Sequence, residues 1–332
     1  MPARLTVPAS TEILDLLEIP TLLLQNDRIL HANQAAIAMF GRHVVGQDIR
    51  MALRHPDAVD LLTSGRNDSV RVSGLSTSGS LWQIDSNDLA DGTRLVTLTD
   101  LSVQESVARA HADFVANASH ELRTPLAAVL GYVETLKDPK AGENAATRLR
   151  FLDIIAKEAN RMQSLVEDLM SLSRIEATKH QHPTDKIDLL SIAKQCIAEC
   201  GQTDRVVLAA DVKEAVIAGD RAQMAQVTRN LIDNALKYGG TEKPVTVRVE
   251  KGNSGWIGLS VIDAGEGIAP QHMPRLTERF YRADPARSRQ IGGTGLGLSI
   301  VKHIVERHRG RFDITSRLGH GTTATCLFPP HP

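Results

Sequence analysis

The stretch Ser119-His120-Glu121-Leu122-Arg123-Thr124-Pro125-Leu126 organises the middle of the chain. Apolar residues recur around it at steps of three and four, which predicts one long helix with a narrow apolar stripe. The stripe consists of Val115, Ala118, Leu122, Leu126, Val129, Val133 and Leu136. His120 falls beside this stripe, so we expect its imidazole at the edge of the helix seam. Pro125 has no N–H, so the carbonyl of Glu121 should lose its partner and the helix should bend or loosen there.

A second apolar series predicts a second helix. Asp138-Pro139-Lys140-Ala141-Gly142 should separate the two helices, since proline and glycine there break the pattern. The second series consists of Leu152, Ile155, Met162, Leu165, Leu169, Leu172 and Ile175. Two antiparallel helices cannot bury both stripes alone. We therefore predict a homodimer that closes a four-helix bundle.

The first hundred residues predict a small α/β unit. Short runs of strand composition lie between polar turns, and a helix at 35–40 is expected to end at Gly41. The expected strands are 21–24, 29–32, 69–72, 81–84 and 93–98. Their order is two strands, then helices, then a meander. Thr99-Asp100-Leu101-Ser102 should pass from the last strand into the helix that carries His120.

Composition excludes several classes of protein. The 332 residues carry 38 basic and 39 acidic side chains, and a net charge of −1 gives no sign of a nucleic-acid or anionic-membrane partner. No run of 18 apolar residues and no signal-peptide pattern is present, so we expect a cytoplasmic chain without a transmembrane segment; a missing N-terminal anchor stays an alternative. Cys196, Cys200 and Cys326 suit a reducing compartment. Cys196 and Cys200 lie four apart on an expected helix, and we interpret them as small buried hydrophobes rather than a redox or metal pair.

Residues beyond 186 contain a polar helix face. Asn230, Asn234 and Lys237 follow one another at i, i+4 and i+7, so two amides and an ammonium point the same way. Such a face suits a hydrated Mg²⁺ and phosphate oxygens, because Mg²⁺ keeps several waters and takes few protein ligands. The flanking positions are apolar, which makes an ordinary solvated face the weaker interpretation.

Two glycine-containing stretches follow this helix. Asp263-Ala264-Gly265-Glu266-Gly267 comes after an expected strand at 257–262, where a carboxylate can accept the amino hydrogens of adenine. Gly293-Thr294-Gly295-Leu296-Gly297 leads into an expected helix at 299–308, whose free N–H groups favour phosphate. Glu278-Arg279-Phe280-Tyr281-Arg282 lies between them with aromatic and guanidinium groups, and 284–290 is interpreted as a lid.

These motifs resemble those of one family. The octapeptide around His120 is similar to the phosphoacceptor box of sensor histidine kinases, and the later stretches match the order and spacing of that family's nucleotide-binding boxes. The start resembles a PAS sensor domain of the phosphate-regulon type, including Val45-Gly46-Gln47 and Arg54-His55-Pro56-Asp57. The resemblance implies an α+β multidomain protein. Its expected parts are a PAS-like domain at 1–103, a helical-hairpin dimerisation and phosphotransfer domain at 104–180, and an α/β-sandwich ATP-binding domain at 181–332.

The resemblance also implies roles for single residues. His120 would take the γ-phosphate of ATP while Glu121 accepts its proton, which suits a neutral imidazole near pH 7. Thr124 would help to place the water that hydrolyses a partner's aspartyl phosphate, with a plain surface threonine as the alternative. For the nucleotide, Asn230 would lie near Mg²⁺ and Asn234 and Lys237 near the phosphates. The remaining implied ATP-binding residues are Tyr238 beside adenine, Asp263 on its amino group, Gly265, Gly267, Arg282 at the γ-phosphate, Gly293, Thr294, Gly295 and Gly297.

The sequence thus predicts an ATP-dependent protein histidine kinase with ATP and Mg²⁺ as cofactors. Phosphohistidine would pass its phosphoryl group to an aspartate in the receiver domain of a response regulator, and the same surface would run the reverse phosphatase reaction. Two alternatives stay open: a phosphatase-biased regulator whose ATP site controls shape, and a non-catalytic PAS scaffold.

Overall fold

The computed structural model describes residues 11–64, 66–138, 144–178, 180–240, 243–252, 255–284 and 292–331. The chain forms two compact units, Met1–Val115 and Ala116–Pro332, which we describe in turn. The predicted interruption at 138–142 and the predicted lid at 284–290 lie outside the described residues except for their first positions, 138 and 284.

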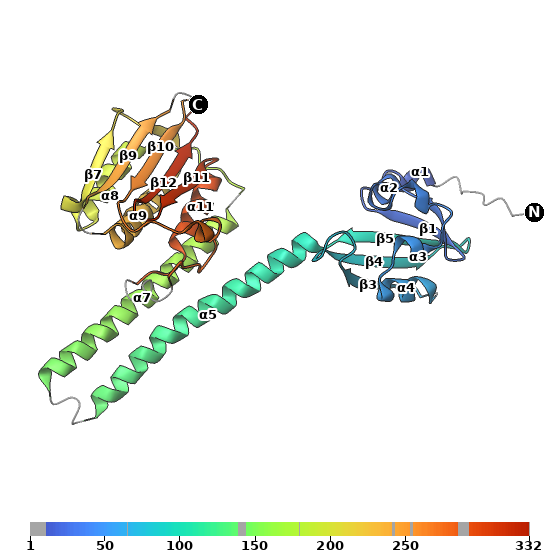
Figure 1. The fold of residues 1–332 in the computed structure, drawn as a ribbon, viewed down its shortest axis with the longest axis horizontal. Helices are drawn as coiled ribbons and strands as arrows, with labels where there is room; N and C mark the ends of the chain where they lie inside the picture. The colour runs from blue at the N-terminus through green and yellow to red at the C-terminus, as the bar shows by residue number, and fades with distance from the viewer. Residues whose placement is uncertain are drawn as a thin grey trace, which may run out of the picture. The chain divides into compact units, whose positions relative to one another are not determined.

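The first unit is a five-stranded antiparallel sheet packed against short helices (Figure 1). Strand order is β2-β1-β5-β4-β3, and Leu22, Ile84 and Leu98 are fully buried. The strands are β1 (Thr21–Gln25), β2 (Arg28–Ala32), β3 (Asp68–Ser73), β4 (Leu81–Asp88) and β5 (Arg94–Asp100). The helices are α1 (Thr11–Leu14), α2 (Gln34–Phe40), η1 (Arg42–Val44), α3 (Ile49–Ala52) and α4 (Pro56–Thr63). The order predicted from sequence, two strands, helices and a meander, is confirmed.

Buried Asn33 joins the start of this unit. Its side-chain oxygen accepts from the amide nitrogens of Thr21 and Ala36, each at 2.9 Å, so it caps α2. Its amide nitrogen lies within 3.1 Å of the carbonyl oxygens of Leu14, Leu17 and Ile19. A buried amide is tolerated only when its polar atoms have partners, and here they tie the stretch 14–21 to the start of α2. Gly41 ends α2 at φ 87°, as predicted.

Two long helices form the hairpin: α5 (Ser102–Lys137) and α7 (Ala145–Ala177). Only Leu101 separates the end of β5 from Ser102, which confirms the predicted passage from strand into helix. The helix α5 continues through Pro125, so the proline does not end it. Tyr132 and Phe151 pack across the hairpin with ring centroids 5.2 Å apart.

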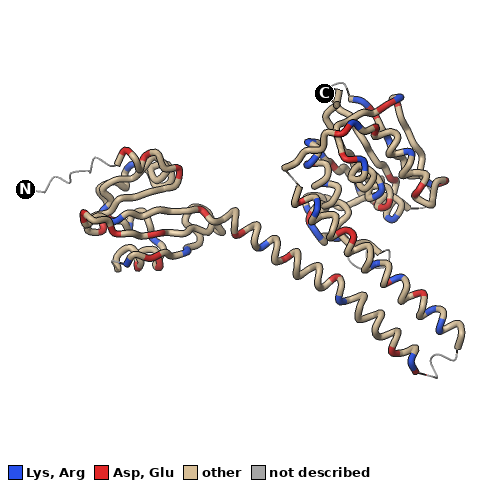
Figure 2. Tube along the Cα trace, turned by 180° about the vertical axis from the view of Figure 1, so that it is seen from behind, with Lys and Arg blue, Asp and Glu red and all other residues tan. Residues whose placement is uncertain are grey.

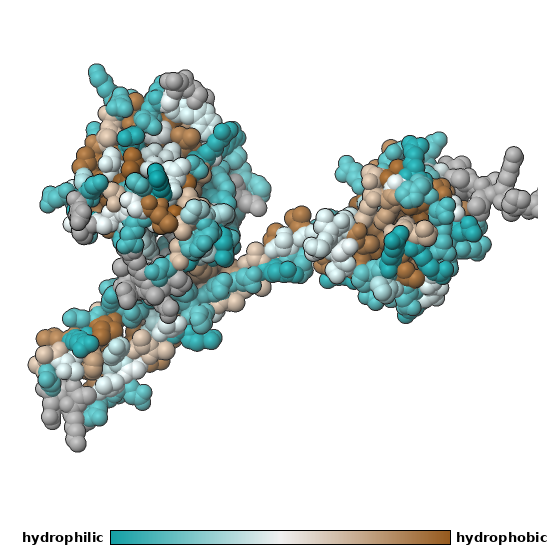
Figure 3. Space-filling model, viewed as in Figure 1, coloured by the Kyte–Doolittle hydropathy of each residue, from teal (hydrophilic) through white to brown (hydrophobic). Residues whose placement is uncertain are grey.

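The hairpin leaves apolar side chains in contact with solvent. Leu126 on α5 and Leu152 on α7 are about half exposed, and brown patches mark the closed end of the hairpin in Figure 3. Other large exposed apolar residues on the two helices within the second unit are Leu130, Val133, Leu149, Val166 and Met170. A single hairpin therefore does not bury both stripes, as predicted. Among the described residues, no helix offers a stretch long and apolar enough to span a bilayer.

The remainder of the second unit is an α/β sandwich. Strands run in the order β11-β12-β10-β9-β7, with β7 parallel to β9, and a separate β6–β8 pair closes one side. The strands are β6 (Lys186–Asp188), β7 (Val206–Ala210), β8 (Val216–Ala218), β9 (Val245–Lys251), β10 (Ile257–Ile262), β11 (Arg311–Arg317) and β12 (Gly321–Phe328). The helices are α8 (Leu189–Glu199), η2 (Thr203–Arg205), α9 (Arg221–Tyr238), η3 (Pro270–Arg275) and α11 (Gly297–Arg307). The sandwich fold predicted for this region is confirmed.

The spacing of apolar side chains on α9 explains how this helix packs on the sheet. Residues 224, 227, 231, 232 and 235 of α9 are buried, so this face packs on β9 and β10. The opposite face carries the predicted asparagines and Lys237. Cys196 on α8 is buried, which confirms its interpretation as a small hydrophobe, whereas Cys200, at the end of that helix, is only partly buried.

Candidate functional site

Helix α9 presents its polar face to the start of α11. Asp220 caps α9 by accepting from the amides of Ala222 and Gln223 at 2.9 and 3.1 Å. The side-chain nitrogen of Asn230 donates to the carbonyl oxygen of Gly297 at 3.3 Å. A side chain at Gly297 would also lie 4.0 Å from the amide nitrogen of Asn234. Both asparagines therefore border the N-terminus of α11, and no side-chain or backbone donor among the described residues takes the amide oxygen of Asn230.

A tight turn after β10 orients Asp263. Its Oδ1 accepts from the amides of Gly265 at 2.8 Å and Thr322 at 3.2 Å, which fixes the plane of the carboxylate. Burial raises the pKa of Asp263 above its usual value. Gly265 passes so close to the carbonyl oxygen of Tyr238 that a side chain there would overlap it. The end of α9 and the Asp263 turn are thus in direct contact.

The second glycine stretch is joined to the stretch around Phe280. The amide of Phe280 donates to the carbonyl oxygen of Gly295 at 2.9 Å. Both residues have positive φ, 62° at Phe280 and 76° at Gly295. A Cβ at Gly295 would lie 2.9 Å from the Cα of Phe280, so glycine is required. The helix that follows begins at Gly297, two residues before the predicted start at 299.

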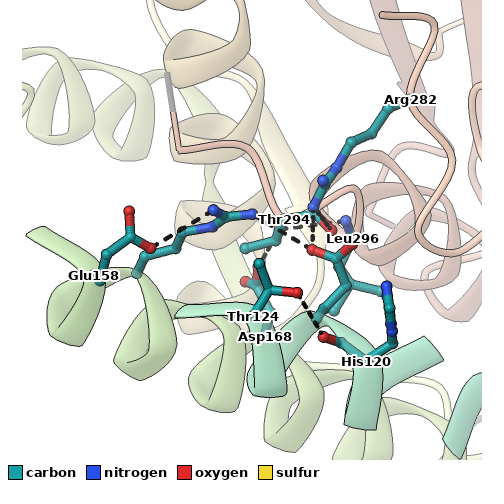
Figure 4. Close-up of polar contacts among 9 residues, drawn as sticks. His120, Thr124, Glu158, Asp168, Arg282, Thr294 and Leu296 are labelled. Atoms are coloured by element: carbon teal, nitrogen blue, oxygen red, sulfur yellow. Dashed lines mark hydrogen bonds and ion pairs between the residues drawn. The ribbon is translucent and has the colours of Figure 1, made fainter. Parts of the chain in front are cut away.

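Asp168 of the hairpin contacts this glycine stretch. Its Oδ2 accepts from Thr294 Oγ1 at 2.8 Å, as Figure 4 shows. Burial raises the pKa of the Asp168 carboxyl, and the charge of nearby Lys237 opposes that rise. A hairpin carboxylate therefore lies beside two of the groups that the sequence assigns to phosphate.

Glu121 lies between two guanidinium groups. Its Oε2 is 2.7 Å from a nitrogen of Arg282 and 3.4 Å from a nitrogen of Arg161, which also pairs with Glu158 at 3.7 Å. The side chains of Arg282 and Arg161 are only 8% and 13% exposed. Arg282 also donates to the carbonyl oxygen of Thr294 at 3.2 Å. Its Nε is buried and has no hydrogen-bond partner among the described residues, so the guanidinium is incompletely satisfied.

Further contacts join the second hairpin helix to the sandwich. Arg279 pairs with Glu176, Ser171 Oγ donates to Gln226 at 2.8 Å, and Arg307 donates to the carbonyl oxygen of Thr178 at 3.2 Å. Basic and acidic residues alternate along both helices of the hairpin, as Figure 2 shows.

His120 borders a cavity of about 250 Å³. Asn117, His120 and Glu121 form its hairpin wall. The facing wall consists of Arg275, Glu278, Arg279, Phe280 and Tyr281. Thr124 is exposed, and its hydroxyl donates to the backbone oxygen of His120 at 3.3 Å, as Figure 4 shows.

Comparison with known proteins assigns both parts of the second unit. Residues 110–178 match the His Kinase A (phospho-acceptor) domain, and residues 219–332 match the histidine kinase-, DNA gyrase B-, and HSP90-like ATPase family. The sensor-like histidine kinase SenX3 of Mycolicibacterium smegmatis is 32% identical over 314 residues, which are 92% of this chain and 77% of that protein. The chain belongs to the sensor histidine kinase family.

Two other relatives bear on its extent and fold. The phosphate regulon sensor protein PhoR of Pseudomonas aeruginosa is 42% identical over 244 residues, which are 71% of this chain. The chain spans about half of that relative, 54% of its length. The histidine kinase ThkA, solved in complex with the response regulator protein TrrA, shares the fold at a TM-score of 0.55 and 18% identity, over 96% of this chain and 97% of its own.

The structure brings most of the residues predicted to bind the nucleotide close to one another. Asn230, Asn234 and Gly297 meet at the start of α11, and the carbonyl of Tyr238 lies against the Asp263 turn. Gly293 and Thr294 precede that helix, while Gly267 follows the same turn as Asp263. Arg282, in contrast, contacts Glu121. Among the described residues, no cluster of three His, Cys, Asp or Glu side chains could hold a metal.

Sequence reasoning missed Arg161, Asp168 and Arg275. The first two lie seven residues apart on α7, so they share a face, but a helix pattern alone does not say what that face meets. Arg275 precedes the recognised aromatic stretch. Finding all three required the packing of the hairpin against the sandwich.

Proposed function

We propose that the chain is an ATP-dependent protein histidine kinase that phosphorylates His120 and passes the phosphoryl group to an aspartate of a response regulator. The observation that carries the proposal is the cradle formed by Asn230, Asn234 and the start of α11. Arg282 links the glycine stretch before α11 to Glu121 of the phosphoacceptor-type helix. We assign a PAS-like sensor domain to 1–103, the phosphotransfer domain to 104–180 and the ATP-binding domain to 181–332.

The residues of the cradle fit ATP and Mg²⁺. The Asn230 amide oxygen is the Mg²⁺ ligand in this proposal, because its nitrogen is occupied by Gly297. Asn234, Lys237, Thr294 and the N–H groups around Gly293, Gly295 and Gly297 would hold phosphate oxygens. Bound Mg²⁺ would neutralise charge on the phosphates.

The opposite end of the site would hold adenine. Asp263 has its Oδ1 fixed by two backbone amides, which leaves Oδ2 to accept from the adenine amino group. Tyr238 would lie beside the base, with Gly265 and Gly267 allowing the backbone to approach it.

Phosphoryl transfer follows from these positions. A nitrogen of His120 forms a bond to the γ-phosphorus as the bond to the bridging oxygen breaks, ADP leaves, and Glu121 accepts the imidazole proton. Arg282 would stabilise charge on the γ-phosphate, which its buried and unpartnered Nε supports. That role requires Arg282 to leave Glu121.

Dimerisation and transfer to a partner complete the proposal. The exposed apolar residues of α5 and α7 would pack in a homodimeric four-helix bundle. Phosphohistidine is a reactive phosphoramidate, so a receiver-domain aspartate can take its phosphoryl group. Thr124, exposed one turn from His120, would position water in the reverse phosphatase reaction.

The test is incubation of the purified chain with γ-labelled ATP and Mg²⁺, beside His120→Gln. We expect the wild type to take up label that is labile to acid and stable to alkali. The His120→Gln variant should take up none. A folded dimer that binds ATP but takes up no label would overturn the kinase proposal in favour of a phosphatase-biased regulator or a scaffold.

A further inference from the structure

The cavity beside His120 lies outside the nucleotide cradle, because its facing wall comes from the stretch 275–281. That wall contributes two guanidinium side chains, Arg275 and Arg279, opposite an imidazole. Guanidinium groups match the oxygens of a phosphoryl group in geometry and charge. The nucleotide cradle does not account for this arrangement.

Arg275 is held in place only by weak contacts. Its guanidinium carbon lies 4.3 Å from the centroid of the Tyr281 ring, and the Tyr281 hydroxyl is fixed at 2.7 Å from His272 Nδ1. Its Nε pairs with Glu278 at 3.0 Å, but the two side chains are 57% and 51% exposed. Exposed ion pairs contribute little, so exchanging Glu278 for a doubly charged phosphoryl group costs little.

The other cations near the cavity are more firmly bound. Arg279 pairs with Glu176, and Arg282 pairs with Glu121 with only 8% of its side chain exposed. Arg275 is therefore the cation of this wall that a new anion on His120 can recruit most easily.

We propose that this cavity binds the phosphoryl group carried by His120, with Arg275 as its principal ligand. The inference rests on the proposed function, because it assigns a place to the product of that reaction. The stretch 275–281 then distinguishes phosphorylated from unphosphorylated hairpin, separately from any bound nucleotide.

The test is a ³¹P NMR titration of the full chain phosphorylated on His120. Phosphoramidate, a small-molecule donor that phosphorylates histidine, supplies the group without any kinase activity. Arg275 should lower the proton affinity of the bound phosphoryl group roughly tenfold relative to Arg275→Ala. Glu278→Gln should shift the titration the opposite way from Arg275→Ala, since it removes the competing carboxylate.

Arg311→Ala is the matched control, because Arg311 also lies over an aromatic ring, Trp256 at 5.5 Å, on β11. It should titrate as the wild type does. Identical titrations for the wild type and Arg275→Ala would overturn the inference. Label from phosphoramidate but not from ATP would instead overturn the proposed function, and the same titration would still decide the role of Arg275.

Discussion

At the scale of single residues, the hairpin supplies side chains that act on both halves of the proposed reaction. Asp168 contacts Thr294 in the glycine stretch, while Arg161 contacts Glu121 beside His120. Both come from α7, which carries neither the proposed phosphoacceptor nor the proposed nucleotide cradle. The second hairpin helix is therefore part of the site rather than only a packing partner.

Asp168→Ala should bind ATP several-fold more tightly than the wild type. The carboxylate takes the Thr294 hydroxyl and lies near Lys237, so it competes with phosphate oxygens for both groups. Hydrogen bonds to charged groups contribute about 1.5–3 kcal/mol, which sets the upper limit of the gain. Calorimetric titration with a non-hydrolysable ATP analogue and Mg²⁺ measures it. Asp153→Ala, exposed on the same helix, is the control, and equal affinity in all three proteins would refute the competition.

Arg161→Ala should slow labelling of His120 about tenfold while the KM for ATP stays unchanged. The guanidinium holds Glu121 from within the hairpin, and loss of orientation lowers the rate rather than nucleotide affinity. Initial rates over a range of ATP concentrations separate kcat from KM. Arg161→Lys should recover part of the rate, and exposed Arg174→Ala should change nothing. A raised KM with normal kcat would contradict this role.

At the scale of elements, Pro125 and His308 show how helices are adapted to the site. Pro125 removes one hydrogen bond from α5 a turn after His120, yet the helix continues. His308, just after α11, accepts from the Asp220 amide at 3.0 Å and so links α11 to the start of α9. Pro125 thus alters the hydrogen bonding of the helix that carries His120, and His308 fixes the start of the helix that carries Asn230.

Pro125→Ala should stabilise the hairpin, by at most about 3 kcal/mol, because alanine restores the amide donor for the Glu121 carbonyl. We expect a higher thermal midpoint together with slower labelling of His120, since the Glu121 carbonyl is then tied into the helix next to His120. Circular dichroism melting and labelling rates test the two parts. A lower midpoint would show that ring packing of buried Pro125 outweighs the missing hydrogen bond.

Stability of the ATP-binding domain should fall as the pH drops below 6.5. Burial lowers the pKa of His308 from that ordinary value. Below pH 6.5 the unfolded chain binds a proton that the folded chain does not, so the free energy of unfolding decreases until the lowered pKa is reached. Urea unfolding followed by Trp256 fluorescence in a Trp82→Phe background measures it. His308→Gln should show a weaker pH dependence, whereas exposed His320→Gln should behave like the parent.

At the scale of the whole molecule, the hairpin exposes an apolar surface, which we expect a second copy of the chain to cover. Leu126, Leu130 and Val133 share a face of α5 and remain between 37% and 60% exposed. A face of this kind on a helix is buried in a stable assembly.

Leu130→Glu should convert the expected homodimer to a monomer in sedimentation experiments. Burying the introduced carboxylate in an apolar seam would be strongly unfavourable. Leu318→Glu is the control, since Leu318 is 58% exposed against 60% for Leu130 but lies in the turn between β11 and β12. Dimers of undiminished affinity in Leu130→Glu would exclude this face as the interface.

The sequence predicted the elements, and it placed the candidate nucleotide residues on them, because both depend on local spacing. Asn230, Asn234 and Lys237 are one helix face, and Asp263 ends a strand, whatever lies around them. The short helices α3 and α4 gave no usable periodicity. The partners of Glu121 and Thr294 could not be found, because Arg282 and Asp168 reach them only through packing of segments far apart in sequence.

The hydrogen bond from Phe280 to Gly295 has a consequence for how this family can vary. It closes a ring of main chain, so the intervening residues begin and end at one fixed point. The entropic cost of lengthening such a ring grows only with the logarithm of its size. Insertions between these two anchors that leave Arg282, Gly293 and Thr294 in place should therefore be tolerated by α9 and α11, which makes the interval a place where the chain can change length.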